Sequence, residues 1–301
     1  MRCHLLKKTD IKSTMKKNRK KKTMVILIPL ILFLLLLLPG LDNRLKVVTY
    51  RLGSETDTQP VRVALVTDLH SCAYGESERE LLDALDTQAP DLVLLGGDFF
   101  DDDLADDNSE AFLQGIRGRY PCFFVTGNHE YWSGETAFAR KMAILEENGV
   151  TRLSGEMAPL EIRGMRLAVC GIDDPFAWGG DGAYTEYSEG SFEKQLAQTA
   201  ALTEEGSFKI LLSHRPEFFD LYSEYDFDLV LSGHAHGGQW RIPGLVNGLY
   251  APRQGLFPAY AGGQYEKNGT VLIVSRGLAR ESTRLPRIYN RPELVIVEIG
   301  R

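Results

Sequence analysis

The sequence is poor in cysteine, and its four cysteines form no recognisable pattern. Cys3, Cys72, Cys122 and Cys170 show neither a CxxC motif nor zinc-finger spacing, which excludes a zinc finger and gives no sign of a disulfide framework. Cys122 and Cys170 lie in apolar runs, so we expect them to be buried as small hydrophobic residues. Cys72 follows His70 by two residues and is a weaker candidate for a soft metal ligand.

Positive charge is scarce outside the first 23 residues. Residues 1–23 hold ten Lys or Arg against one acid, whereas the whole chain has a net charge of −7, so the remainder carries −16. An acidic protein body is a poor partner for nucleic acid, because the phosphate backbone needs basic surface. We therefore expect no nucleic-acid partner, although a groove could be locally positive or made so by metal ions.

The chain has one long hydrophobic run, at residues 24–39, which contains no charge and follows the basic stretch directly. At ~1.5 Å per residue a helix there is about 24 Å long, a little short of the ~30 Å hydrocarbon core. The residues after it contain no A-x-A-like cleavage site, and no twin-arginine pair precedes it. This favours an uncleaved transmembrane anchor at 24–41, with a cleaved signal peptide as the alternative.

The positive-inside rule then places residues 1–23 in the cytoplasm as a basic tail. We predict a single-pass protein of the cell membrane whose acidic body is extracytoplasmic.

The rest of the chain alternates short apolar runs with amphipathic stretches. Residues 42–60 are expected to form a linker and a first edge element, and residues 61–301 one domain. Strands are predicted at 61–67, 92–96, 122–126, 166–171, 209–213, 229–232, 271–275 and 293–299, and helices at 76–87, 135–148, 192–204 and 216–222. Such alternation is typical of a layered α/β fold. The part after about Gly206 has more strands, which predicts a second sheet packed on the first.

Two features between these elements are assigned to loops. The acidic run 101–107 follows a predicted strand, and its favoured interpretation is a solvated loop rather than an additional metal site. The segments 178–187 and 255–265 are rich in glycine and aromatic residues. They could line a substrate cleft, but plain loops are favoured.

Histidine is also scarce, and its placement is informative. Of six histidines, His4 lies in the basic tail, and the other five lie immediately beyond predicted strands beside Asp, Asn or Gly. Loops at the ends of strands are where α/β folds bind ligands. The candidate side chains in these loops are Asp68 and His70, Asp98, Asn128 and His129, His214, and His234 and His236.

The number of candidate ligands indicates more than one metal ion. A single zinc site needs three or four protein ligands, and the motifs offer two Asp, one Asn and five His. Two metals are therefore the natural interpretation, and one carboxylate can bridge both ions. Mixed imidazole and carboxylate ligation suits zinc, iron or manganese rather than calcium.

The order of the motifs resembles that of the calcineurin-like metallophosphoesterase superfamily. The pattern is DxH at 68–70, GGD at 96–98, GNHE at 127–130, SH at 213–214 and GHAH at 233–236. Further segments, GGQ at 237–239, APRQG at 251–255, VSRG at 274–277 and PEL at 292–294, look like the bacterial membrane-associated branch related to the YkuE and YaeI phosphoesterases.

The resemblance implies a four-layer α/β/β/α sandwich, and it assigns each candidate ligand to one of two metal ions. One metal would be held by Asp68, His70, Asp98 and His236, and the other by Asp98, Asn128, His214 and His234, with Asp98 bridging. His129 would face the phosphate as general acid or transition-state stabiliser, and Glu130 would orient it. Asn128 would also touch substrate, and Arg215, beside a ligand, is a weak candidate for contact with a phosphate oxygen.

The chemistry that follows is hydrolysis of a phosphoester. Two divalent ions neutralise the phosphate oxygens and lower the pKa of a water molecule, whose hydroxide attacks phosphorus. We predict a phosphodiesterase or pyrophosphatase, with lipid-linked or envelope substrates suggested by the anchor. A phosphomonoesterase or protein phosphatase, and a non-catalytic metal-stabilised module that binds the envelope, are the alternatives. The sequence gives no oligomeric state.

Overall fold

A computed structural model describes residues 24, 28, 29, 31, 35, 37–53, 59–179, 189–280 and 285–300. The chain divides into two compact units, Met1–Asp42 and Asn43–Arg301; the second is called the body below. Among the described residues no helix combines the length and apolar character that crossing a membrane requires. The predicted basic tail, and much of the predicted anchor at 24–41, lie outside the described residues, so the anchor stays a prediction.

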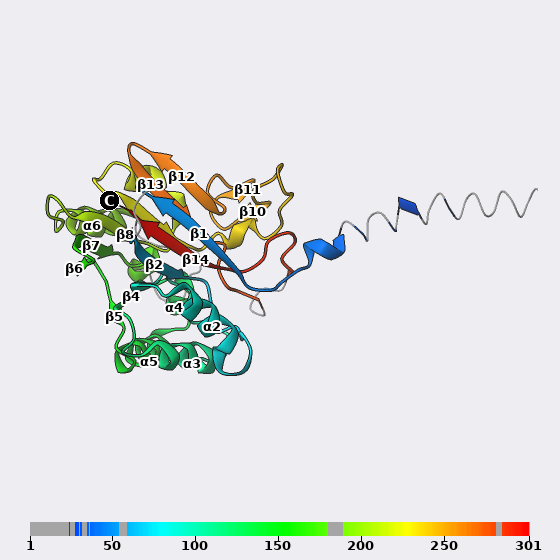
Figure 1. Cartoon of the computed structure of the whole chain (residues 1–301), viewed down its shortest axis with the longest axis horizontal. Helices are drawn as coiled ribbons and strands as arrows, with labels where there is room; N and C mark the ends of the chain where they lie inside the picture. The colour runs from blue at the N-terminus through cyan, green and yellow to red at the C-terminus, as the bar shows by residue number, and fades with distance from the viewer. Residues whose placement is uncertain are drawn as a thin grey trace, which may run out of the picture. The chain divides into compact units, whose positions relative to one another are not determined.

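The body contains two six-stranded sheets (Figure 1). Strands β2, β3, β4 and β5 of the first sheet are parallel, and β14 lies between β2 and the edge strand β1, antiparallel to β2 and parallel to β1. In order across the sheet the strands are β1 (Lys46–Leu52), β14 (Glu293–Ile299), β2 (Val61–Val66), β3 (Leu92–Leu95), β4 (Cys122–Phe124) and β5 (Thr151–Arg152).

The second sheet has a parallel centre and antiparallel edges. Strands β13, β9, β8 and β7 are parallel, and β12 and β6 run antiparallel to their neighbours at the two edges. In order the strands are β12 (Gly263–Lys267), β13 (Thr270–Val274), β9 (Leu229–Ser232), β8 (Phe208–Leu212), β7 (Met165–Gly171) and β6 (Glu156–Ile162). A short hairpin, β10 (Tyr250–Ala251) with β11 (Gly255–Leu256), lies between β9 and β12 in the chain.

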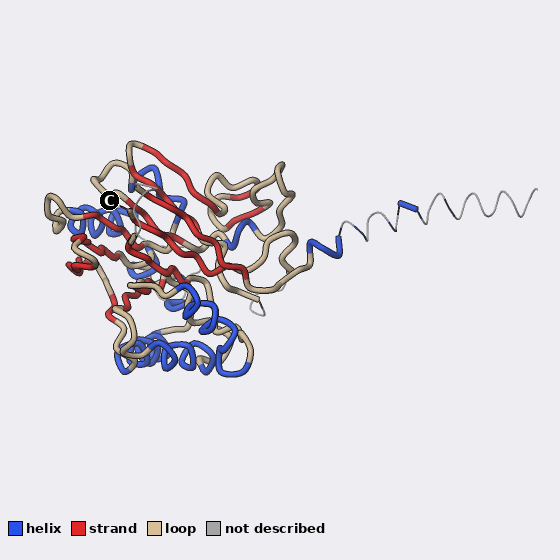
Figure 2. The backbone as a smooth tube through the Cα atoms, viewed as in Figure 1, coloured by secondary structure: helices blue, strands red, loops and turns tan. Residues whose placement is uncertain are grey.

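Helices cover the outer faces of both sheets. The helices α2 (Arg79–Gln88), α3 (Asp107–Ile116) and α5 (Glu135–Glu147) pack on one face of the first sheet (Figure 2), and the short α4 (Asn128–Trp132) follows β4. The helices α6 (Glu189–Ala200) and α7 (Phe219–Tyr222) belong to the second sheet. Short 3₁₀ turns are η1 (Glu76–Glu78), η2 (Pro175–Trp178), η3 (Pro216–Phe218) and η4 (His236–Gly238).

Alternating side chains along the strands build three hydrophobic layers. In β2, Val63 and Leu65 pack against β8 and β9 residues of the second sheet, whereas Ala64 and Val66 pack against helices α2, α3 and α5. A third cluster joins the outer face of the second sheet to α6 and α7 through Phe192, Phe219 and Tyr222. Since successive side chains of a strand point to opposite faces, this alternation produces the order helix, sheet, sheet, helix. The predicted α/β sandwich is therefore the observed one.

All eight predicted strands are present, but the division into sheets differs from the prediction. The second sheet begins with β6 and β7, before Gly206, and the last strand, β14, returns to the first sheet. The strands β5, β6, β10, β11 and β12, and the helices α3 and α4, were not predicted. Helix α3 begins at Asp107, inside the acidic run that we had assigned to a loop.

Candidate metal centre

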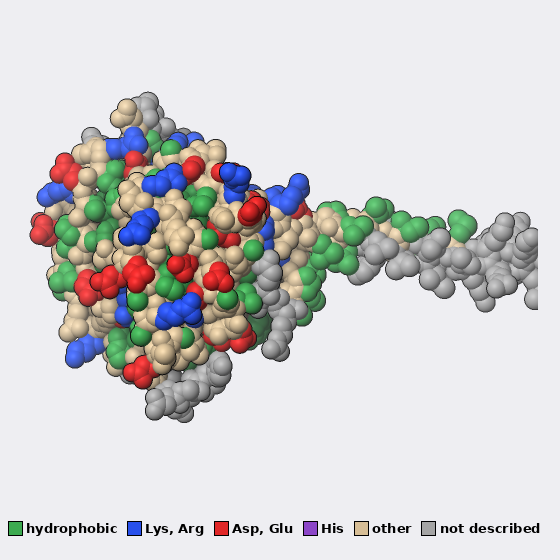
Figure 3. Space-filling view, turned by 90° about the horizontal axis from the view of Figure 1, so that it is seen from below, with side chains coloured by type: hydrophobic (Ala, Val, Ile, Leu, Met, Phe, Trp, Pro, Cys, Tyr) green, Lys and Arg blue, Asp and Glu red, His purple; other side chains and the backbone are tan. Residues whose placement is uncertain are grey.

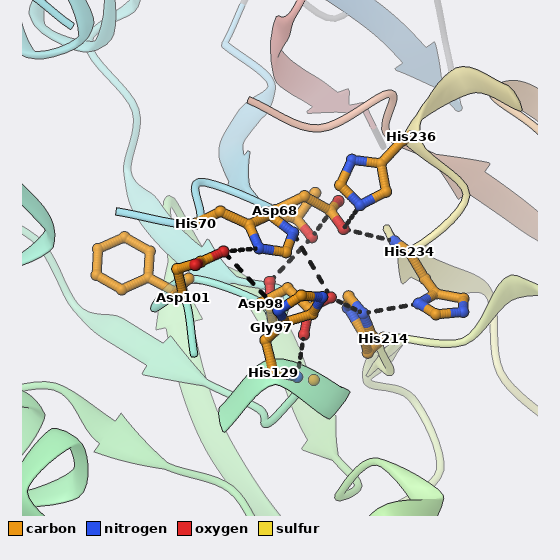
Figure 4. Close-up of polar contacts among 12 residues, drawn as sticks. Asp68, His70, Gly97, Asp98, Asp101, His129, His214, His234 and His236 are labelled. Atoms are coloured by element: carbon orange, nitrogen blue, oxygen red, sulfur yellow. Dashed lines mark hydrogen bonds and ion pairs between the residues drawn. The ribbon is translucent and has the colours of Figure 1, made fainter. Parts of the chain in front are cut away.

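The candidate ligands lie at the carboxyl ends of parallel strands. Asp68 and His70 follow β2, Asp98 follows β3, and Asn128 and His129 begin α4 just after β4. His214 follows β8, and His234 and His236 follow β9. Because parallel strands end at the same edge of a sheet, two sheets packed face to face bring all five loops to one place. Figure 4 shows the labelled side chains converging there.

One group of ligand atoms contains Asp68, His70, Asp98 and His236. One ligand atom from each of these residues lies within 4.8 Å of those of the others. His70 Nε2 lies 3.7 Å from an Asp98 carboxylate oxygen, and His236 Nε2 lies 3.6 Å from Asp68 Oδ1. These separations exceed a hydrogen bond and are close to the roughly 3.3–3.6 Å between neighbouring ligand atoms of a tetrahedral cation, for which metal–ligand bonds are about 2.0–2.2 Å.

A second group, defined by the same 4.8 Å separation, contains Asp98, His214 and His234. His214 Nε2 lies 3.0 Å from Asp98 Oδ2 and 3.2 Å from His234 Nδ1. Asp98 thus belongs to both groups. A third group, of His70, Asp101 and His129, shares His70 with the first.

Three buried polar atoms of the candidate ligands have no hydrogen-bond partner. They are His70 Nε2, His236 Nδ1 and the side-chain oxygen of Asn128. A buried polar atom without a partner costs about 1–3 kcal/mol, and a cation relieves this cost by accepting the lone pair. The residues present therefore fit divalent metal ions, with nitrogen and oxygen donors of the kind that zinc, iron and manganese accept.

The backbone of the site is held in an unusual conformation. Asp68, His70, Asp98, His234 and His236 all have φ between 46° and 63°. Non-glycine residues in this left-handed region cost on the order of 1–3 kcal/mol each and cluster at functional sites. The surrounding structure therefore stabilises a strained backbone that turns these side chains toward one another.

Two glycines allow the loops to approach closely. A Cβ at Gly127 would lie 2.2 Å from Asp98 Oδ1, and a Cβ at Gly233 would lie 2.4 Å from Asp68 Oδ2. Both distances are far below van der Waals contact, so only glycine fits at these positions.

The electrostatics favour a cation beside Asp98. Burial opposes ionisation of Asp98, but the charges of His214 and His129 and the His214 hydrogen bond outweigh burial, so its pKa lies well below the ordinary value. Burial likewise disfavours a charged His214, yet the Asp98 carboxylate raises the pKa of His214 to about 10. A proton on His214 therefore supplies positive charge to this carboxylate, and it must leave when the ring binds metal.

The pKa values of the two histidines after β9 are shifted in the opposite direction from that of His214. Burial lowers the pKa of His234 well below its ordinary value, helped by the charges of Arg215 and His214. Burial and the neighbouring His70 and Arg287 do the same for His236. Both rings are neutral at pH 7, which is the form that binds a metal ion.

Neighbouring oxygens orient the other rings. His214 Nδ1 donates to the backbone oxygen of Gly96 over 2.9 Å, so its Nε2 is directed toward Asp98. His70 Nδ1 lies 2.9 Å from Asp101 Oδ2, which leaves its Nε2 facing Asp98. Contacts of this kind fix the tautomer of a metal-binding histidine. Asp101 has a role that sequence reasoning did not find.

His129 lies beside both groups and has a carboxylate partner of its own. Its Nδ1 lies 2.5 Å from Asp102 Oδ1, and its ring lies 4.3 Å from the ring of His70. Burial lowers the pKa of His129, but the Asp98 charge and the Asp102 hydrogen bond raise it to about 9. The ring is therefore protonated near pH 7 and can donate a proton.

The acidic run 101–107 is only in part the solvated loop that we predicted, since residues 103–105 are exposed but the residues on either side are not all so. Asp101 and Asp106 are buried, and Asp101 and Asp102 contact the histidine rings described above. The signal in the sequence was their position, three and four residues after Asp98 at the end of a strand. Side chains so close to a candidate ligand remain within reach of the site.

The role predicted for Glu130 is also corrected. Its two carboxylate oxygens accept hydrogen bonds of 2.7–3.0 Å from the backbone N–H groups of Asp98, Phe99, Phe100 and Gly127. The ring of His129 is contacted instead by Asp102. Glu130 therefore joins the loop after β3 to the start of α4 and fixes the position of the Asp98 backbone.

We expect Glu130→Ala to destabilise the protein by more than about 3 kcal/mol, because four buried backbone donors lose their acceptor at once. Glu130→Gln keeps one acceptor oxygen and should lose less. Urea unfolding of both variants measures this, with the exposed Glu146→Ala on α5 as control. A loss for Glu130→Ala no larger than that of the control would contradict this role.

Arg215 does not have the predicted position for phosphate contact. Its guanidinium is buried and is bound by the Asp174 carboxylate. Its Nη1 lies 2.7 Å from His234 Nε2, whereas the other ring nitrogen, Nδ1, faces His214. Arg215 thus contacts His234 through the ring nitrogen that faces away from His214 and the second group of ligand atoms.

The other sequence predictions can be placed as well. Cys122 and Cys170 are buried and free, as predicted. Cys72 is also buried, and its sulfur accepts a hydrogen bond from the backbone of Arg280 rather than joining either ligand group. Residues 180–188, most of one segment considered as a cleft lining, lie outside the described residues.

Comparison with known proteins identifies relatives of this arrangement. A sequence profile described as calcineurin-like phosphoesterase matches residues 61–238. "Uncharacterized protein YpbG" of Bacillus subtilis is 28% identical over 85% of this chain and 88% of its own length. "Phosphodiesterase YaeI" of Escherichia coli is 26% identical over 84% and 88%. "Uncharacterized metallophosphoesterase YkuE" of Bacillus subtilis is 25% identical over 78% and 77%.

A solved structure shares the fold. The NAD nucleotidase NadN of Haemophilus influenzae superimposes with a TM-score of 0.51 at 18% identity, covering 73% of this chain and 46% of that one. At this level of identity the likeness shows the fold alone.

Proposed function

Since this chain belongs to the calcineurin-like phosphoesterase family, we propose that it hydrolyses phosphodiester or pyrophosphate bonds with two divalent metal ions. The observation that carries the proposal is the position of Asp98, whose carboxylate is shared by the two groups of ligand atoms. A shared carboxylate is how two-metal sites hold their ions together.

The first ion would be held by Asp68, His70, Asp98 and His236. The second would be held by Asp98, His214 and His234, with the unpartnered side-chain oxygen of Asn128 as its fourth donor. Manganese, zinc or iron suits this mixture of imidazole and oxygen ligands. When bound, the ions supply positive charge against the phosphate oxygens and acidify a water molecule for attack on phosphorus.

The residues of the chain then contribute orientation and a proton. Asp101 and the Gly96 carbonyl hold two ligand rings in place, and Glu130 fixes the backbone of Asp98. His129, protonated and held by Asp102, is placed to donate a proton to the leaving oxygen. A non-catalytic metal module would not need His129, and this ring is therefore the feature that favours catalysis.

The name of the relative YaeI, a phosphodiesterase, supports diesters over monoesters as substrates. A phosphomonoesterase or protein phosphatase is the second candidate. For the location we propose a single membrane anchor at 24–41 with the body outside the cytoplasm, which the basic tail and the apolar run support. Protease digestion of intact cells tests the location, because a cytoplasmic body would be protected.

A substrate panel tests the activity. The full chain, stripped of metal with a chelator and reloaded with manganese, zinc or iron, is assayed on bis(p-nitrophenyl) phosphate, p-nitrophenyl phosphate and a lipid pyrophosphate. We expect turnover to require added metal and to favour the diester or pyrophosphate. Hydrolysis that survives chelation would contradict the proposal, and a preference for the monoester would favour the second candidate.

A further inference from the structure

Exposed large hydrophobic side chains are concentrated in one part of the body. Among its described residues nine such side chains are exposed. All but Leu104 and Leu202 lie at residues 240–257 or at position 285. These seven are Trp240, Ile242, Leu245, Tyr250, Leu256, Phe257 and Leu285. Figure 3 shows one face of the body, on which acidic, basic and hydrophobic side chains are interspersed. An apolar concentration of this kind usually marks a binding surface.

The segment between β9 and β12 that carries most of these residues is almost wholly loop (Figure 2), and it encloses a cleft. The cleft has a volume of about 430 Å³, within the range of small-molecule sites. Its lining includes Trp240, Leu249, Tyr250 and Leu285 and is mainly apolar. We call it the loop cleft.

The loop cleft adjoins the metal centre. His236 lines the cleft and also belongs to the group with Asp68, His70 and Asp98. A phosphate bound at that group would therefore have one of its substituents near the cleft. Tyr250 is paired directly with Leu256 across the β10–β11 hairpin, and such pairs share a face, so the apolar lining continues onto the exposed rim.

Hydrogen bonds hold the walls of the loop cleft in position. The indole N–H of Trp240 donates to the Pro286 carbonyl over 2.9 Å, and Asn290 Nδ2 donates to the His236 carbonyl over 2.7 Å. Gly238, which lines the cleft, also packs closely on the backbone behind it, since a Cβ at Gly238 would lie 2.3 Å from the Cα of Gly248. The cleft is therefore formed before a ligand binds.

We propose that the loop cleft binds the alkyl chain of an amphiphilic phosphoester whose phosphate lies at the metal centre. This inference rests on the proposed function and names its substrate class. A sugar or other polar substituent would leave its hydroxyl groups without partners against this lining, which is costly. An alkyl chain has no such groups and buries apolar surface on both sides.

The expected effect is a dependence of KM on chain length. Burying one CH₂ group contributes about 0.8 kcal/mol, equivalent to about fourfold in affinity. Allowing for partial burial, we expect kcat/KM for an octyl p-nitrophenyl phosphodiester to exceed that for the methyl diester by at least about tenfold, mostly through KM. Both esters are used below the concentration at which they form micelles.

Tyr250→Asp places a charge in the loop cleft and should reduce the octyl-to-methyl ratio of kcat/KM to near one. Leu202→Asp, an exposed leucine outside the segment, is the matched control and should keep the wild-type ratio. A ratio unchanged in Tyr250→Asp, or a wild-type ratio near one, would overturn the inference. Hydrolysis of the methyl diester by the wild type tests the proposed function separately.

Photolabelling gives a second measurement that does not depend on turnover. Dodecyl phosphate with a diazirine at the end of its chain should label residues 235–257 or Leu285 of the full, metal-loaded chain, which line the cleft and its rim. Labelling should fall in Tyr250→Asp but not in Leu202→Asp. Labelling elsewhere, or equal labelling of both variants, would overturn the inference. The inference would also be overturned if the wild type were a dimer that Tyr250→Asp dissociates while labelling stays the same. A second copy of the chain would then cover the cleft.

Discussion

Asp98→Ala should abolish both metal binding and hydrolysis. The Asp98 carboxylate is shared by the two ligand groups, so its removal takes one ligand from each. It also leaves His214 without the anion that raises its pKa. Loss of a partner outside the ligand set typically reduces metal affinity or activity 10–100-fold, and we expect more than about 100-fold here. Metal content by plasma mass spectrometry and turnover on bis(p-nitrophenyl) phosphate measure the two effects.

A second substitution separates loss of metal from loss of fold. Asp98→Asn preserves the shape of the side chain and one oxygen for the hydrogen bond from the His129 backbone, so this variant should fold. It should nevertheless bind less metal than the wild type. Asp103→Asn, an exposed carboxylate in the same loop, is the control and should keep both properties. Full metal content in Asp98→Ala would contradict the assignment of Asp98 as the shared ligand.

His129→Ala should keep the metal ions and lose about 10²–10⁴-fold in kcat, the usual contribution of a general acid. Its ring nitrogen Nδ1 is taken by Asp102, and the proposed ligand sets are complete without it. The loss should be larger for a phenyl ester than for a p-nitrophenyl ester, because p-nitrophenolate leaves without needing a proton. Single-turnover rates on the two esters, beside metal analysis, test this.

The dependence on the leaving group is what distinguishes proton donation from a structural role. A variant that merely distorts the site should slow both esters equally. Asp102→Asn should produce a smaller loss with the same preference, since it weakens the contact that holds the His129 ring. Loss of metal in His129→Ala would show that this ring is a ligand instead.

Much of the candidate site could be predicted from the sequence because its ligands are local to strand ends. Five of the parallel strands, β2, β3, β4, β8 and β9, are followed within four residues by a candidate ligand, as at Asp68 after β2 and His214 after β8. The layered fold then requires these ends to meet. The assignment of Asp98 to both groups came from the resemblance and agrees with the geometry.

The features that were not predicted depend on contacts between distant residues or on weak local signals. The burial of Arg215 depends on Asp174, about 40 residues away, which no local pattern indicates. Strand β6 contains Pro159 and was not recognised, because proline usually argues against a strand; β6 is an edge strand, where proline is tolerated. Helix α3 was not predicted because its acidic start suggested a solvated loop.

The loop cleft was not recognisable from the sequence for a similar reason. The favoured interpretation of residues 255–265 was a plain loop, and the cleft is lined instead by residues close to His236, by three residues between 249 and 252, and by Leu285. Hydrophobic residues scattered through a long loop give no periodic pattern. Only the folded chain shows that they lie side by side and next to a metal ligand.

Anomalous X-ray diffraction from crystals of the manganese-loaded full chain tests the central claim most directly. The account predicts two anomalous peaks about 3.5–4 Å apart, one on each side of the Asp98 carboxylate. A single peak at this site, or two peaks that do not share Asp98, would contradict it.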